Sequence, residues 1–271
     1  MTQSEAIDFS NDEVWALWEP LIEVVRPKGK TAPQDLRRTL SAIVWRHTNG
    51  TKWRSVPPHL GPWWRAAQLS IRWSKLGVWQ RLLDLCQQRG LSLGLVHLDG
   101  TVIRAHQKAA GAEKRGSRGR SETSVKLWDP HPEPVEGSRG GYGTKACMIC
   151  DGRGLPIAFR LVPGQAHELP QAGPLLAGLP RPPQWVVADK GYAAHAFRDA
   201  IWEMGSRPAI PAKSNEAPVV CPAWIYNNRH HIENAWARIK EWRAVATRYE
   251  KTAISFMGVL CLAAAVQWIK R

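Results

Sequence analysis

The chain has 271 residues, enough for one large domain or two small ones, each with its own apolar core. Lys and Arg outnumber Asp and Glu by 37 to 23, which gives a formal net charge of +14 at pH 7. This excess favours a polyanionic partner, nucleic acid before an anionic membrane. Five cysteines, an odd number, follow an acidic, polar start that does not resemble a signal peptide. The composition therefore favours reduced thiols and a cytoplasmic location.

Four helices are predicted in the first ninety residues. Their sequences are DEVWALWEPLIEVV, PQDLRRTLSAIVWRHTN, PWWRAAQLSIRWSKL and VWQRLLDLCQQR. The last three are each followed by a glycine, which is a common signal for the end of a helix. We therefore expect residues 1–90 to form an all-α domain.

The charge of this N-terminal part is uneven. Residues 1–25 hold six acids and no base, whereas Arg26 to Arg81 hold twelve bases and the single acid Asp35. Such a stretch is typical of a surface that faces phosphates, although a solvated basic face is the alternative. We expect residues 1–90 to bind DNA, and the candidate contacts are Arg54, Arg65 and Arg72.

After Gly90 the pattern changes to short apolar runs that predict buried strands, namely LGLVHLD, TKACMICD, LPIAFRLV and QWVVAD. Helices return with HAFRDAIWEMG and with YNNRHHIENAWARIK. We therefore expect an α/β domain over residues 91–271. Within it, residues 107–143 are rich in Pro, Gly and charge, which predicts a flexible loop.

Two apolar segments could suggest a zinc or redox site and a membrane span, but their sequences do not support these functions. Cys147 and Cys150 form a CxxC within a predicted strand, where residues three apart point to opposite faces, so a zinc or redox site is not expected. The run AISFMGVLCLAAAVQW has only sixteen residues and predicts a buried helix, not a membrane span. Most of the fifteen tryptophans fit core positions, and Trp64 and Trp242 are the two that we consider for base stacking.

Three acids stand out by their positions. Asp99 closes the predicted strand LGLVHLD, and Asp189 closes QWVVAD. Strand ends in open α/β sheets often carry functional sites. The alternative is that each Asp simply stabilises the turn that follows it. The third acid, Glu233, lies on a predicted helix, where it shares an arc of ~60° with three other polar residues. These are Tyr226, Arg229 and Lys240. A solvated salt-bridge face is the alternative for this stripe.

The order Asp, Asp, then Tyr, Arg, Glu and Lys in YNNRHHIENAWARIK resembles the signature of bacterial DDE transposases of the insertion-sequence-five type. The resemblance extends over most of the chain. It includes WRHTNGTKWRSVPPHLGPWWRAAQLSIRWSKLGVW near the N-terminus and then LDGTVIRAH, RGGYGTK, PGQAHE and VVADKGY. One departure is KLWDPHPEPVEG, which lengthens a connection that is short in the family and leaves open whether this copy is active.

The resemblance implies a ribonuclease-H-like catalytic domain, a mixed sheet flanked by helices. It implies that Asp99, Asp189 and Glu233 bind two Mg²⁺ ions, for which Mn²⁺ could substitute. It also implies contacts to double-stranded DNA, at the terminal inverted repeats and the target, by a homodimer or higher oligomer at the bacterial nucleoid. The residues expected at this DNA are Tyr226, Arg229, Lys240 and Arg243.

Two other functions remain open from the sequence. A non-catalytic DNA-binding protein descended from such an enzyme would keep the basic N-terminal part and would not need the three acids. Another ribonuclease-H-like nuclease would keep the acids and would not need the Tyr, Arg and Lys stripe.

Overall fold

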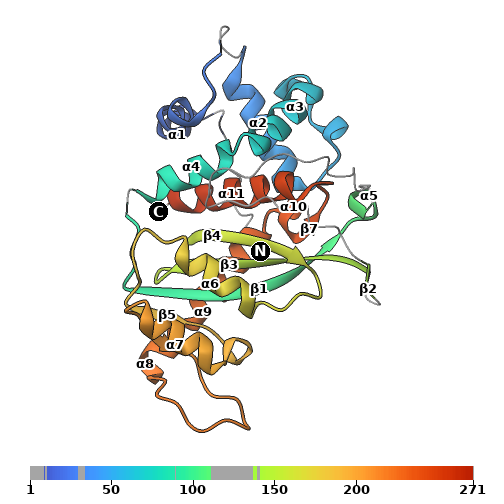
Figure 1. Cartoon of the computed structure of the whole chain (residues 1–271). Helices are drawn as coiled ribbons and strands as arrows, with labels where there is room; N and C mark the ends of the chain where they lie inside the picture. The colour runs from blue at the N-terminus through green and yellow to red at the C-terminus, as the bar shows by residue number, and fades with distance from the viewer. Residues whose placement is uncertain are drawn as a thin grey trace, which may run out of the picture.

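The computed structural model describes residues 9, 11–29, 34–88, 90–110, 137–138 and 141–270. Its N-terminal part is helical, as the sequence predicts (Figure 1). It contains α1 (Asp12–Val25), α2 (Leu36–Asn49), the 3-10 turns η1 (Trp53–Ser55) and η2 (Pro58–Leu60), α3 (Trp63–Lys75) and α4 (Val78–Gln87). Gly50 ends α2 in the left-handed conformation, φ 59°, which glycine adopts without steric cost.

A mixed sheet forms the centre of the remaining chain. Its strands are β1 (Leu95–Ala105), β2 (Gly137–Ser138), β3 (Gly141–Asp151), β4 (Pro156–Pro163), β5 (Trp185–Val187), β6 (Arg207–Ala209) and β7 (Thr247–Arg248). The main order is β4-β3-β1-β5-β6, in which β1, β3 and β4 are antiparallel and β5 and β6 run parallel to β1. Three antiparallel strands followed by two parallel ones make a ribonuclease-H-like sheet, so the predicted fold class is confirmed.

Helices cover both faces of the sheet. Leu98 and Cys147 lie in a cluster with α6 (Leu169–Ala177) and α7 (His195–Glu203) on one face. Ile103 and Cys150 face the other side, where α9 (His230–Lys240), α10 (Arg243–Ala246), α11 (Ala253–Ile269) and the N-terminal helices pack. The two cysteines therefore point to opposite faces and are buried, as the sequence predicts.

Helix α11 lies between the N-terminal helices and the sheet (Figure 1). Twelve of its seventeen residues are buried, and its buried apolar side chains join α1–α4, β1, β3 and β4 in one hydrophobic cluster. The expectation of a buried C-terminal helix is thus confirmed. Among the helices that the structure describes, none is long and apolar enough to cross a membrane.

Three local expectations differ from the structure. Strand β1 does not end at Asp99 but continues to Ala105, because the run TVIRA pairs with β3 from Thr101 to Arg104. The predicted continuous helix from Tyr226 to Lys240 is divided into α8 (Ala223–Tyr226), the 3-10 turn η4 (Asn227–Arg229) and α9. The predicted loop 107–143 contains α5 (Gln107–Ala110), β2 and the start of β3, and its residues 111–136 and 139–140 lie outside the described part.

Candidate active site

Three separate elements carry the acids that the sequence singles out. Asp99 lies in the middle of β1, and Asp189 follows β5, the parallel neighbour of β1. The carboxylate of Asp189 accepts a hydrogen bond of 2.8 Å from the backbone N–H of Gly191, which fixes the turn η3 (Lys190–Tyr192). Glu233 lies in the first turn of α9, whose buried Ile232, Trp236 and Ile239 hold the helix against the sheet.

The guanidinium of Arg229 joins these three carboxylates. Its Nη1 donates a hydrogen bond of 2.6 Å to Oε1 of Glu233. Its Nη2 lies 3.8 Å from Oδ1 of Asp99 and 4.0 Å from Oδ2 of Asp189. Residues from β1, the end of β5 and α9 therefore face one shared cation.

Carboxylate oxygens are the donors that hard divalent cations prefer. Within the described part of the chain, no three His, Cys, Asp or Glu side chains are grouped closely enough to hold one metal ion. A guanidinium is larger than a metal ion, so carboxylates that surround Arg229 stand further apart than metal ligands do. The donor set fits a divalent metal in its chemistry, and Arg229 currently provides the positive charge.

Burial sets the electrostatics around β1. Burial raises the pKa of Asp99 to about 6. The Arg229 guanidinium acts to lower this pKa, whereas the nearby carboxylates of Glu168 and Asp189 raise it further. Burial also lowers the pKa of His97, two residues earlier on the same face, to about 4. His97 is fully buried and lies beside His231 of α9 with ring centroids 5.9 Å apart, so it is a neutral packing residue.

The remaining polar residues of the predicted stripe also lie along α8 to α9. The ammonium of Lys240 donates a hydrogen bond of 2.7 Å to the hydroxyl of Thr101, two residues after Asp99 on β1. It also lies 5.9 Å from the ring centroid of Trp236. Tyr226 is half-buried before η4, and burial raises the pKa of its phenol.

One further acid, Glu168, was not among the predicted site residues. Its carboxylate accepts a hydrogen bond of 3.1 Å from the hydroxyl of Tyr192 and lies 3.3 Å from the ammonium of Lys145. A Cβ on Gly100 would lie 2.4 Å from the carboxyl carbon of Glu168, so a larger residue there would displace this carboxylate. Because successive strand residues face opposite sides, Glu168 approaches β1 from the face opposite Asp99. Its signal in the sequence was the motif PGQAHE, which ends at this residue.

The other predicted DNA contacts lie on the helical part and on α10. Arg54 stacks over Trp63 at 5.4 Å, and Arg65 stacks over Trp64 at 5.6 Å. Arg72 and Arg243 are exposed, and Arg243 lies beside Gly50 at the end of α2. Of the two tryptophans considered for base stacking, Trp242 is buried, so that expectation is wrong for Trp242, whereas Trp64 is 47% exposed.

Comparison with known proteins gives matches along most of the chain. A family described as "Putative transposase of IS4/5 family" matches residues 11–83. Two families described as "Transposase DDE domain" match residues 92–218 and 186–270. Together these ranges include Asp99, Asp189 and Glu233.

Solved structures that resemble the chain were also compared. The solved complexes are distant: a piggyBac transposase synaptic complex covers 81% of this chain and 46% of that chain at 15% identity with a TM-score of 0.35. A Mos1 strand transfer complex covers 95% and 83% at 13% identity with a TM-score of 0.30, and neither likeness supports a functional assignment.

Two curated proteins are more similar in sequence. A Burkholderia cepacia protein, "Putative transposase for insertion sequence element IS402", is 25% identical over 51% of this chain and 68% of its own length. A Brucella ovis protein, "Putative transposase for insertion sequence element IS6501", is 34% identical over 47% of this chain and 98% of its own length. By these matches, the chain belongs to the DDE transposases of bacterial insertion sequences.

Proposed function

We propose that this DDE transposase binds the terminal inverted repeats of its insertion sequence, cleaves phosphodiester bonds at the element ends and joins the freed 3′ hydroxyls to target DNA. DDE enzymes work with divalent metal ions, and we propose two Mg²⁺ ions here, with Mn²⁺ as a substitute. Asp99, Asp189 and Glu233 would hold them. The observation that carries the proposal is that these three carboxylates, from three elements, share the single cationic group of Arg229.

The chemistry fits this donor set. A pair of divalent ions, about 3.5–4 Å apart, stabilises charge on the attacking and leaving oxygens of an in-line displacement. The chain's own part is to hold the acids in place: α9 is fixed by its buried face, and the Asp189 turn is fixed by the Gly191 N–H. Arg229, released from the carboxylates, would then be positioned to bind a DNA phosphate bidentately.

Lys240 supports the same arrangement from the other end of α9. Its ammonium is held on Thr101 beside the acids, where a DNA phosphate would meet it. We propose Tyr226 and Arg243 as further contacts to the strand in the site, and Arg54, Arg65 and Arg72 as contacts from a DNA-binding region over residues 1–90. Joining two element ends requires two sites, so a homodimer or higher oligomer at the nucleoid follows from the proposal.

The test is the replacement Glu233→Gln in the full chain. Gln keeps the size and removes the negative charge, so Mg²⁺-dependent nicking of a plasmid that carries the element ends should fall by orders of magnitude. Binding of the ends should remain, because the basic residues are unchanged. Glu241→Gln, at the exposed C-terminal cap of α9 and just over two turns from Glu233, is the matched control and should nick like the parent. Equal nicking by Glu233→Gln would refute the three-carboxylate site.

A further inference from the structure

Helix α3 has two sharply different faces. Ala66, Ala67, Ser70, Trp73 and Ser74 are buried against the rest of the protein. On the opposite side, six residues fall within an arc of ~120° at 3.6 residues per turn. They are Trp64, Arg65, Gln68, Ile71, Arg72 and Lys75, all at least partly exposed.

The chemistry of this outer face is unusual for a solvated surface. Trp64 is 47% exposed and Ile71 is 43% exposed, one on each side of the exposed Gln68. The whole helix carries three bases and no acid. Large exposed apolar side chains within a basic surface indicate a contact with a partner, and the charge favours a polyanion.

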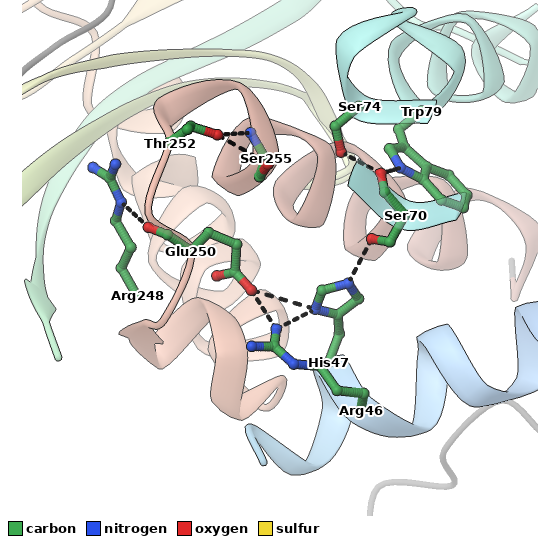
Figure 2. A network of polar contacts seen from close by, with 9 residues as sticks. All are labelled: Arg46, His47, Ser70, Ser74, Trp79, Arg248, Glu250, Thr252 and Ser255. Atoms are coloured by element: carbon green, nitrogen blue, oxygen red, sulfur yellow. Dashed lines mark hydrogen bonds and ion pairs between the residues drawn. The ribbon is translucent and has the colours of Figure 1, made fainter. Parts of the chain in front are cut away.

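Polar contacts on the buried face connect α3 to α2 and to the C-terminal part of the chain. Figure 2 shows the hydroxyl of Ser70 bonded to the imidazole of His47 on α2, and the hydroxyl of Ser74 bonded to the Ser70 carbonyl at 2.8 Å. His47 in turn lies in the buried ion pair of Arg46 and Glu250. The outer side chains are thus held on a fixed helix whose position is tied to the C-terminal part of the chain.

We propose that α3 enters the major groove of the element's terminal repeat and that Gln68 reads a base there. The groove, about 12 Å wide, admits an α-helix of about 10–12 Å diameter. The amide of Gln68 can bond an adenine edge bidentately, and Trp64 and Ile71 lie where thymine methyl groups would contact apolar side chains. Arg65 and Arg72 lie at one edge of this arc and Lys75 lies at the C-terminal end of the helix, where they bind neighbouring phosphates. This inference rests on the proposed binding of terminal repeats.

The probe is a pool of randomised DNA duplexes from which the full-length chain selects its preferred sequence. The parent and Gln68→Ala are compared on the selected duplex and on each single base-pair change of it. Gln68→Ala should lose about tenfold discrimination at one A·T pair and should keep the preferences elsewhere. Arg72→Ala should weaken binding to all sequences alike and reduce the slope of log affinity against log salt by about one. Gln88→Ala, an exposed glutamine just after α4, is the matched control and should leave both measurements unchanged.

Two results would overturn the inference and leave the proposed function in place. In the first, Gln68→Ala and Trp64→Ala keep the sequence preference of the parent protein, which would mean that other residues read the bases. In the second, Trp64→Ala and Ile71→Ser change the sedimentation of the protein but not the DNA sequence that it selects. The outer face of α3 would then be a contact between copies of the chain. A parent that neither selects a sequence nor nicks DNA would overturn the proposed function and this inference together.

Discussion

At the scale of single residues, His47 shows what burial does to an ionisable group. Its Nδ1 accepts a hydrogen bond of 2.9 Å from Arg46, and its Nε2 lies 3.4 Å from the hydroxyl of Ser70 (Figure 2). Burial, with a smaller effect of the Arg46 charge, holds the pKa of His47 well below 6.5. The imidazole is therefore neutral in the folded chain, and Glu250 pairs with Arg46 instead.

This shift predicts a loss of stability in acid. Below pH 6.5 the unfolded chain takes up a proton at His47 and the folded chain does not, so the free energy of unfolding should fall by about 1.4 kcal/mol per pH unit from this residue. Above pH 6.5 both states are neutral and the contribution is constant. His47→Gln keeps hydrogen-bonding groups and cannot titrate, so its slope between pH 6.5 and 5 should be smaller by that amount. Urea unfolding at several pH values measures both slopes, and equal slopes would show that His47 is protonated in the fold.

At the scale of elements, the close approach of α11 to α3 and α4 depends on a glycine. A Cβ on Gly258 would lie 2.3 Å from the hydroxyl of Ser74 and 2.8 Å from Cδ1 of Trp79. Trp79 is buried and tilted against Trp73 at 5.0 Å, so it has little freedom to move. The sequence predicts each of these helices, but it does not show which glycine lies where two of them meet.

Gly258→Ala should therefore destabilise the protein by about 1–3 kcal/mol through overpacking. Removing the Ser74 hydroxyl in the same chain, as Ser74→Ala, should recover part of the loss because one of the two close atoms is gone. Gly173→Ala on α6 is the matched control: no atom lies within 4 Å of its Cβ position, so helix propensity alone should stabilise it by about 0.5–1 kcal/mol. The measurement is the thermal unfolding midpoint of the parent, the two Gly→Ala variants and the double variant. Equal midpoints for Gly258→Ala and Gly173→Ala would contradict the packing argument.

At the scale of the whole molecule, the helical N-terminal part and the sheet share one apolar cluster. Helix α11 supplies much of the surface between them, with buried residues from Phe256 to Trp268. The Arg46–Glu250 pair and the hydrogen bond from Arg248 to the hydroxyl of Thr144 on β3 continue this connection through polar groups. The composition change near Gly90 therefore does not coincide with a break in the core.

A chain that begins at residue 91 should accordingly fail to fold alone. It would expose the face of α11 that α3 and α4 cover, and at about 25 cal/mol per Å² of apolar surface this loss is large compared with the stability of a domain. We expect aggregation, or a state that binds a hydrophobic dye and unfolds without a cooperative transition. A monomeric fragment with sharp thermal unfolding would contradict this. For DNA binding, substitutions of Arg54, Arg65 and Arg72 are thus a cleaner test than truncation.

The sequence by itself determined the local features of this protein. Helix periodicity predicted the four N-terminal helices, short apolar runs predicted the main strands, and the length and apolar composition of the C-terminal run predicted the buried α11. The order of Asp99, Asp189 and Glu233 indicated the family resemblance. The signals for helices and strands lie within a few neighbouring residues, where side-chain spacing and turn chemistry act directly, whereas the three acids are recognised by their order along the chain.

Only the tertiary structure decided which distant residues meet. It showed that Arg229 bridges acids from β1, the end of β5 and α9, that Glu168 fills the space at Gly100, and that Trp64 is exposed while Trp242 is buried. It also showed that β1 continues beyond Asp99, because β3 pairs with the residues that follow. Contacts between segments far apart in the chain depend on how faces pack together, and that packing leaves no periodic mark in the sequence.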